Sequence, residues 1–141
     1  MTPQIQSGVL AYRCRDGQWE VLLVKKTGSQ NWGIPKGNWE AHLSLCENAE
    51  KEAFEEAGVS GNIGPQSLGL YRALKRIADR EILVEVWVYP LEVTISAAQW
   101  PEQETRAQIW LPPGEAAKLL REPFLIHCCE QLNKRQNLNE L

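Results

Sequence analysis

The sequence contains no apolar run of about 18 residues, the length that a membrane-spanning helix needs. Residues 1–7 carry neither a basic start nor an apolar stretch, which argues against a secretory signal peptide. The four cysteines lack the paired spacing of a zinc site, and Cys128 and Cys129 are adjacent. We therefore expect reduced thiols, a cytoplasmic protein and no membrane partner.

A strong net charge is also lacking, because 15 basic residues face 18 acidic ones and the sum is −3. This balance argues against a nucleic-acid partner held by bulk positive charge. The phosphate-binding pattern G-x(4)-G-K-[ST] is absent, which excludes a Walker-type nucleotide enzyme. No repeat or linker divides the 141 residues and 43% of them are apolar, so residues 1–141 predict a single globular domain.

Short β-rich runs separated by turn residues predict a sheet. Two of them, residues 7–13 and 19–25, flank Asp16-Gly17 and predict a hairpin. Further strands are expected at residues 32–34, 67–74, 81–94 and 106–111, and helices at residues 113–121 and 124–134. Pro90 cannot donate a backbone hydrogen bond, so its strand is expected at a sheet edge or at a bulge. The irregular alternation predicts a mixed sheet with helices on both faces.

A further helix is predicted over residues 45–57 by its end signals. Ser44 and Glu47 have the spacing of a capping box at its start. Gly58 is the residue type that ends helices in the left-handed conformation. Inside the helix, alanines recur every four residues and predict a narrow face for close packing; they are Ala49, Ala53 and Ala57.

Acidic residues are concentrated around this helix, since six of the 18 fall between Glu40 and Glu56. Glu52, Glu55 and Glu56 span an arc of roughly 100° on the predicted helix. Like charges at this spacing destabilise a helix by about 0.2–0.5 kcal/mol per pair. A divalent cation with oxygen ligands, such as Mg²⁺ or Mn²⁺, would offset that repulsion. The alternative is a solvated acidic face with ordinary surface ion pairs.

Residues 37–59 resemble the Nudix box, G-x(5)-E-x(7)-R-E-U-x-E-E-x-G-U, in which U is an aliphatic residue. The matching positions are Gly37, Glu52, Ala53, Glu55, Glu56, Gly58 and Val59. The preceding residues 32–37 are similar to the loop that leads into the box in hydrolases of polyphosphorylated substrates. Downstream positions resemble the branch that contains diphosphoinositol polyphosphate and diadenosine polyphosphate hydrolases; they are Glu92, Thr94, Trp100, Glu102, Arg106 and Trp110.

Two positions depart from the box. Leu43 stands where the first glutamate belongs, and Lys51 stands where the arginine belongs. In the family these two residues commonly pair and brace the loop-helix-loop. Lys51 keeps a positive charge and is spaced along the helix to pair with Glu47 or Glu55 instead. The joint change leaves the three box glutamates in place but removes an acidic group that sometimes joins the metal shell.

The resemblance implies an α/β (α+β) fold, a Nudix-like α/β/α sandwich with a mixed sheet and a loop-helix-loop catalytic motif. It implies a pyrophosphohydrolase that uses Mg²⁺ or Mn²⁺ to direct water at a phosphorus atom of a diphosphate linkage. Glu52 and Glu56 are then expected metal ligands, and the Gly37 carbonyl is a further one. Glu55 is expected to be a ligand or the general base, so that Glu52 and Glu55 form the expected catalytic pair.

The resemblance also implies residues that meet the substrate. The substrate-binding candidates are Lys36, Arg72, Lys75 and Trp32, and the candidates for an additional carboxylate are Glu102 and Glu104. Clustered cations favour a polyphosphorylated small molecule of the dinucleoside polyphosphate, nucleoside triphosphate or diphosphoinositol phosphate type. Two alternatives stay open: a substrate such as ADP-ribose or a nucleotide sugar, and a non-catalytic Nudix-fold ligand-binding module. The oligomeric state is not indicated by the sequence.

Overall fold

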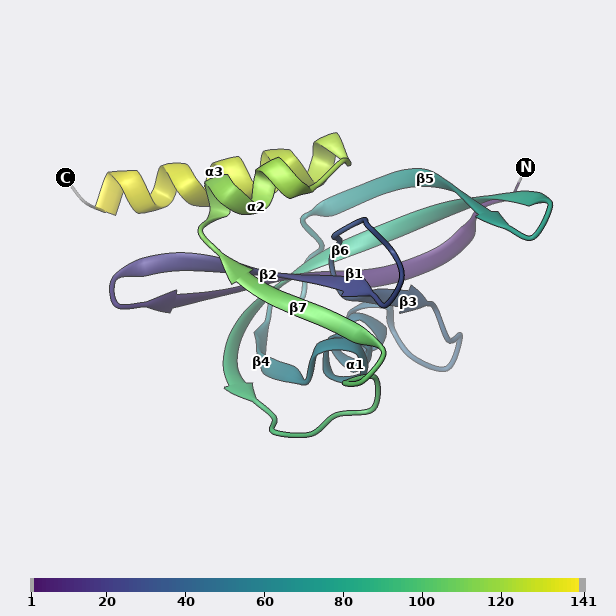
Figure 1. Ribbon diagram of the computed structural model, residues 1–141, viewed down its shortest axis with the longest axis horizontal. Coiled ribbons are helices and arrows are strands. Elements are labelled where there is room, and N and C mark those ends of the chain that lie inside the picture. The colour runs from purple at the N-terminus through teal and green to yellow at the C-terminus, as the bar shows by residue number, and fades with distance from the viewer. Residues whose placement is uncertain (1, 140–141) are drawn as a thin grey trace.

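A mixed sheet forms the middle layer of the molecule, with helices on both of its faces (Figure 1). The computed structural model describes residues 2–139, with side chains through residue 135. The strands are β1 (Gln4–Arg15), β2 (Gln18–Lys26), β3 (Lys36–Asn38), β4 (Val59–Ile63), β5 (Gly69–Ile77), β6 (Arg80–Ser96) and β7 (Arg106–Leu111). The helices are α1 (Leu45–Ala57), α2 (Pro113–Leu119) and α3 (Pro123–Asn139).

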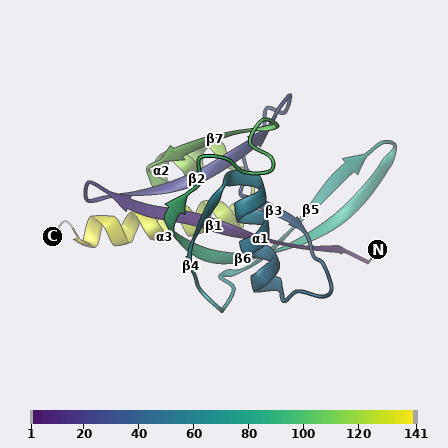
Figure 2. The ribbon, with the colours of Figure 1, turned by 90° about the horizontal axis from the view of Figure 1, so that it is seen from below.

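The strand order is β4-β6-β1-β2-β7, with β3 added to β1 and β5 added to β6. Strands β1 and β6 run parallel, and the other pairings are antiparallel. Helix α1 covers one face of the sheet, and α2 and α3 cover the other (Figures 1 and 2). The end of the β5–β6 hairpin extends beyond the covered part of the sheet (Figure 2). The predicted mixed sheet with helices on both faces is therefore confirmed.

Helix α1 begins and ends as its sequence predicts. The Ser44 side chain accepts a hydrogen bond from the Glu47 N–H at 3.0 Å. The Glu47 side chain in turn accepts one from the Ser44 N–H at 2.9 Å. Gly58 ends the helix in the left-handed conformation, with φ of 69°. The three alanines are buried against the sheet, and their small side chains let α1 lie close to it. Local capping and spacing thus fix the position of the acidic helix.

Three strand predictions differ from the structure. Residues 32–34 contribute only an isolated bridge from Gly33 to Val24, and the short strand lies at β3 instead. Strand β4 is an additional strand, because its irregular sequence becomes a strand only by pairing with β6. Strand β6 is central rather than an edge, and Pro90 lies where its partner changes from β5, paired through Val88, to β4. The missing N–H of Pro90 is tolerated at this break between partners.

The remaining elements agree with the sequence except at their ends. Strand β7 has the predicted bounds, α2 ends two residues early and α3 continues to Asn139. All four cysteines are free. Among residues 2–139, no helix combines the length and apolar character needed to cross a membrane.

Candidate functional site

The acidic side of α1 meets the loop before β7. Carboxylate oxygens of Glu52, Glu55 and Glu102 lie within 4.8 Å of one another. The loop is held there because the Glu102 N–H donates to the Glu55 carbonyl at 2.9 Å. The Trp100 indole donates to the Glu56 carbonyl at 3.2 Å, which ties the loop to the last turn of the helix. A residue far from the box in sequence therefore completes a group of three carboxylates.

A partly buried arginine lies on one side of this group. The Arg106 Nη2 is 3.1 Å from Glu56 Oε2, and its Nε donates to Glu102 Oε1 at 3.0 Å. The other oxygen of Glu56 accepts the Lys36 N–H at 3.1 Å. Burial raises the pKa of Glu56 to about 7, against the lowering effects of Arg106 and the Lys36 N–H. We call Glu56, Arg106 and Glu102 the inner flank.

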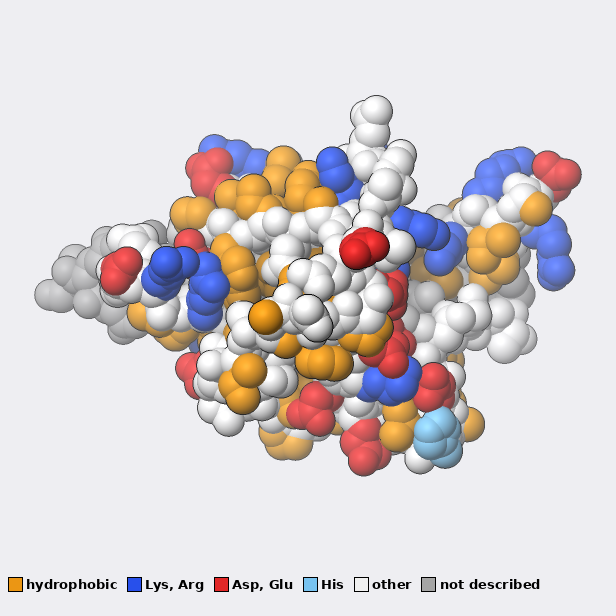
Figure 3. Space-filling model, turned by 60° about the horizontal axis from the view of Figure 1, so that its bottom comes forward, with side chains coloured by type: hydrophobic (Ala, Val, Ile, Leu, Met, Phe, Trp, Pro, Cys, Tyr) orange, Lys and Arg blue, Asp and Glu red, His pale blue; other side chains and the backbone are white. Residues whose placement is uncertain are grey.

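A lysine lies on the opposite side of the group. The Lys51 Nζ is 2.8 Å from Glu55 Oε1 and 3.3 Å from Glu40 Oε1. We call Lys51, Glu40 and Glu55 the outer flank. Figure 3 shows acidic and basic side chains intermixed on the face of the molecule that carries α1. The cluster of carboxylates is thus bounded by one cation on each side.

The residues present fit a divalent cation. Glu52, Glu55 and Glu102 offer carboxylate oxygens, the ligands that hard divalent cations prefer. Burial raises the pKa of Glu52, and the negative charge of Glu55 adds to the effect. A bound cation would relieve both costs. Gly37 lies directly against the Glu52 carboxylate, because a Cβ at position 37 would overlap the Glu52 side chain. Glycine at this position therefore keeps the backbone close to the candidate metal ligands.

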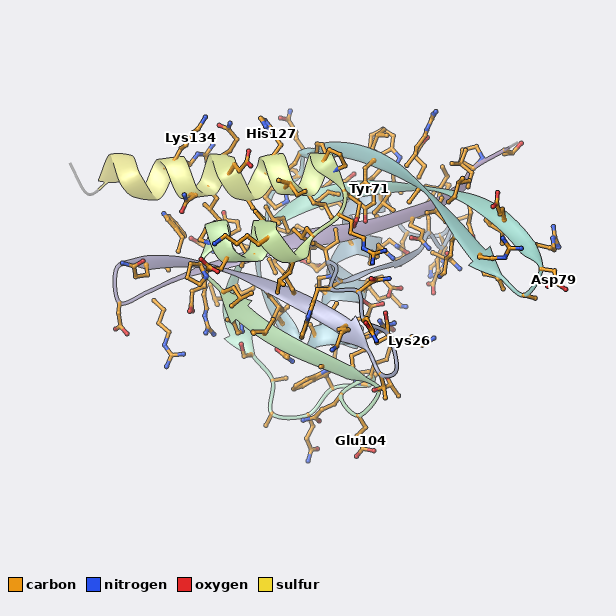
Figure 4. The ribbon with its side chains drawn as sticks, turned by 45° about the horizontal axis from the view of Figure 1, so that its top comes forward. Lys26, Tyr71, Asp79, Glu104, His127 and Lys134 are labelled. Carbon is orange, nitrogen blue, oxygen red and sulfur yellow. The ribbon has the colours of Figure 1, made fainter. Side chains whose placement is uncertain are left out.

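A cleft of about 580 Å³ opens beside the inner flank and reaches Glu56. Its basic lining residues are Lys26, Lys36, Lys75, Arg106 and Arg121. Burial lowers the pKa of Lys36, whereas the carboxylate of Glu56 acts in the opposite direction. Trp32 and Tyr71 supply aromatic surface to the same cleft. Figure 4 shows Tyr71 on β5, Lys26 at the end of β2, and Asp79 at the tip of the β5–β6 hairpin. A polyanion next to a carboxylate-bound cation matches this charge pattern.

The family model for the NUDIX domain matches residues 4–128. The chain belongs to the Nudix hydrolase family. It is 32% identical over 141 residues to the mitochondrial Nudix hydrolase 18 of Arabidopsis thaliana, covering 95% of this chain and 78% of that protein. It spans 57% and 62% of the lengths of Nudix hydrolases 12 and 17 of the same plant. It is 31% identical over 118 residues to human diphosphoinositol polyphosphate phosphohydrolase 3-beta, covering 82% of this chain and 68% of that protein.

Solved structures of Nudix proteins share the fold. A Caenorhabditis elegans Ap4A hydrolase in a binary complex superposes with a TM-score of 0.64 at 18% identity, covering 93% of this chain and 96% of that one. The Nudix domain of Shewanella oneidensis NrtR, complexed with ADP ribose, gives a TM-score of 0.68 at 18% identity, covering 96% and 89%. The family membership supports the prediction of an enzyme over that of a non-catalytic binding module.

The structure separates the predicted substrate residues of this Nudix hydrolase into two groups. Lys36, Lys75 and Trp32 line the cleft. Arg72 does not, because neighbouring residues of β5 point to opposite faces of the sheet and Arg72 lies on the α1 side. There its Nε and Nη2 contact Glu85 Oε2 at 3.0 and 2.9 Å. The alternation of β5 therefore gives Lys75, but not Arg72, a place at the cleft.

The structure also shows which of the predicted acidic residues lie close together. Glu52 lies against Gly37 and forms a group with Glu55 and Glu102, whereas Glu56 lies outside this group and pairs with Arg106. Glu104 is exposed and projects from the loop before β7 (Figure 4), and it is not a member of the carboxylate group. Lys51 contacts Glu55 as predicted but not Glu47, because Glu47 caps the helix at Ser44. Of the two candidates for an additional carboxylate, Glu102 therefore lies with Glu52 and Glu55, and Glu104 does not.

Two residues of the site carry roles that sequence reasoning did not assign. The sequence indicates Arg106 only through the downstream similarity, and the structure makes it the counter-ion of Glu56 and Glu102. The sequence indicates Glu40 only as one of the six clustered acids, and the structure makes it a partner of Lys51. Arg106 lies 50 residues beyond Glu56 in the chain. No short-range spacing could have indicated that pair, since sheet pairing brings the two together.

Proposed function

We propose that this Nudix hydrolase cleaves a diphosphate linkage in a polyphosphorylated small molecule and uses Mg²⁺ or Mn²⁺. The single observation that carries the proposal is the arrangement of the cleft. It is lined by five lysine and arginine side chains and reaches Glu56, next to the carboxylate group of Glu52, Glu55 and Glu102. Cations along a cleft bind phosphates through charge-assisted hydrogen bonds, and carboxylates at its end hold the metal.

The proposed metal ligands are Glu52, Glu55, Glu56 and Glu102, together with the Gly37 carbonyl. A divalent cation at this position supplies charge neutralisation at the phosphate oxygens and an activated water. Glu52 and Glu55 are the proposed catalytic residues, and Glu55 is the proposed acceptor of the water's proton. Glu56 is buried against Arg106, and this pair orients the carboxylate before substrate enters.

Lys36 is the central residue of substrate binding in this proposal. Its N–H holds Glu56 and its side chain lines the cleft, so it links the catalytic carboxylates to the phosphate path. Lys75 and Arg121 add positive charge to the same lining. Each charge-assisted contact to a phosphate contributes roughly 1.5–3 kcal/mol. Catalytic efficiency is therefore expected to rise with the number of phosphates in the substrate.

The test compares diadenosine tetraphosphate with ADP-ribose at matched concentrations in the presence of Mg²⁺. We expect a higher kcat/KM for diadenosine tetraphosphate. Replacing Lys36 by Ala should lower kcat/KM more for the longer phosphate chain, and added salt should reduce the difference between substrates. Chelation should abolish hydrolysis, and Mg²⁺ or Mn²⁺ should restore it.

A second candidate substrate class, ADP-ribose, is favoured by one observation. Trp32 and Tyr71 give the cleft aromatic surface on which a base can stack, and the Lys25 ammonium lies 4.9 Å from the centre of the Trp32 ring. Equal or faster hydrolysis of ADP-ribose would overturn the polyphosphate preference. Trp32→Leu would then be expected to lower the rate with ADP-ribose more than Lys36→Ala does.

A further inference from the structure

In the Nudix box, the first glutamate commonly pairs with the basic residue of the helix. This chain lacks that glutamate, because position 43 is a leucine. Lys51 nevertheless has two carboxylate partners. Its Nζ is 2.8 Å from Glu55 Oε1 and 3.3 Å from Glu40 Oε1. Glu40 lies three residues before Leu43 in the same loop. Glu40, a carboxylate at another position of the loop, therefore pairs with Lys51 of the helix.

Glu40 is held in place by a buried side chain of α1. Its N–H donates to Asn48 Oδ1 at 3.0 Å, and the Asn48 amide donates to Ser7 Oγ of β1 at 2.9 Å. The Glu40 carbonyl accepts the Leu43 N–H at 2.9 Å, and the Leu43 carbonyl accepts the Trp39 indole at 2.8 Å. These bonds connect the loop, the helix and the sheet. The position of Glu40 relative to Lys51 is thus set by a hydrogen-bond network that includes the buried Asn48–Ser7 contact.

The charge of Glu40 affects what Lys51 does to Glu55. A lysine whose only partner is Glu55 would neutralise a carboxylate that the cation needs. With Glu40 as a second partner, the charge of Lys51 is balanced and the group of Glu52, Glu55 and Glu102 keeps its net negative charge. Lys51 then fixes the direction of the Glu55 side chain through the 2.8 Å contact.

We propose that Glu40 is a positioning residue, which supplies the counter-charge absent at Leu43 and so lets Lys51 orient Glu55 without neutralising it. This inference rests on the proposed function, because Glu55 matters as a residue of the metal and catalytic site. It is specific to a box with leucine at position 43.

The first experiment compares Glu40→Gln with Glu50→Gln. Both variants lose one negative charge. Glu50 is an exposed residue of α1 and lies next to Lys51 in the sequence. We measure Mn²⁺ affinity of the metal-free protein by calorimetry, and kcat and KM on diadenosine tetraphosphate. Glu40→Gln should weaken Mn²⁺ binding and lower kcat by about threefold to fivefold, the upper range for an exposed ion pair, with KM unchanged. Glu50→Gln should change each quantity by less than about twofold.

Two further variants test the route through Lys51. In a Lys51→Met background, Glu40→Gln should have almost no additional effect, because interacting residues are non-additive. Adding Leu43→Glu to Glu40→Gln should return kcat and Mn²⁺ affinity to within about twofold of the unchanged protein, since it restores a loop carboxylate at the box position.

Two results would overturn the inference. One is equal behaviour of Glu40→Gln and Glu50→Gln in Mn²⁺ affinity. The other is an undiminished effect of Glu40→Gln in the Lys51→Met background. Both rest on metal binding without substrate, so they are independent of the substrate assignment. If the unchanged protein hydrolyses no diphosphate compound, the proposed function fails, while the coupling of Glu40 to Lys51 is still measured by Mn²⁺ affinity.

Discussion

The two flanks of the carboxylate group use the same kind of ion pair at different depths. In the inner flank the side chains of Arg106 and Glu56 are 21% and 7% exposed. In the outer flank those of Lys51 and Glu40 are 36% and 42% exposed. Glu56 and Arg106 of the inner flank line the basic cleft, whereas the outer flank is more exposed to solvent and lies beside the box loop. The two flanks differ in how deeply their ion pairs are buried, and not in the number of ion pairs.

The difference has an energetic consequence. Removing one partner of a buried pair leaves an uncompensated charge out of water, which costs about 3–5 kcal/mol. An exposed pair contributes about 0–1 kcal/mol, because water already solvates both charges. The inner flank should therefore affect both folding and chemistry. The outer flank should adjust the chemistry with little effect on stability.

The largest effect is expected at the carboxylates themselves. Glu52→Gln or Glu56→Gln should reduce kcat by at least about 10²-fold, the scale for losing a positioned catalytic group. Steady-state kinetics on diadenosine tetraphosphate measures the loss. Glu104→Gln is the matched control, because Glu104 is exposed and lies outside the cluster. Near-normal rates in both variants would mean that the catalytic site lies elsewhere.

Arg106 should matter most for stability. Arg106→Met leaves Glu56 buried beside Glu102 with no cationic side chain in contact, and we expect a loss of about 3–5 kcal/mol in the free energy of unfolding at pH 8. Urea denaturation measures it. The double variant Arg106→Met/Glu56→Gln should recover most of the loss, since no charge is then buried. A loss below about 1 kcal/mol in the single variant would contradict the assignment of this flank as buried.

Stability should also depend on pH through Glu56. Its pKa is about 7 in the folded protein, against 4.5 for an ordinary glutamate. Between these values the folded state holds a proton that the unfolded chain has released, so the free energy of unfolding falls as pH rises from about 4.5 to 7. The fall is at most about 3 kcal/mol. Denaturation in chelator from pH 5 to 8 measures it, and Glu56→Gln should remove this part of the slope. An identical slope in the variant would exclude Glu56 as its source.

The smallest effect is expected in the outer flank. Leu43→Glu should change the free energy of unfolding by less than about 1 kcal/mol, because Leu43 is only partly buried and Lys51 is available as a partner. Thermal unfolding provides the measurement. A large decrease in melting temperature would identify Leu43 as a core residue and contradict the description of the box loop.

Local signals in the sequence predicted the acidic helix α1 and much of the sheet. The capping box at Ser44, the alanine spacing and Gly58 together gave the bounds of α1. Strand β4 could not be predicted, because Gly61 and Asn62 have little intrinsic strand preference and the segment is ordered by β6. The displacement of the short strand to β3 has the same cause, since it depends on pairing with β1. The cytoplasmic location stays a prediction.

The sequence by itself determined that the box glutamates lie together on one helix, because the ends and phase of that helix are set by neighbours within four residues. The tertiary structure alone decided which charges meet. Sheet pairing brings Arg106 to Glu56, and the buried Asn48–Ser7 contact helps fix the loop that brings Glu40 to Lys51. The alternation of side chains along β5 places Lys75, but not Arg72, at the cleft. These contacts depend on burial and long-range pairing, which no local pattern encodes.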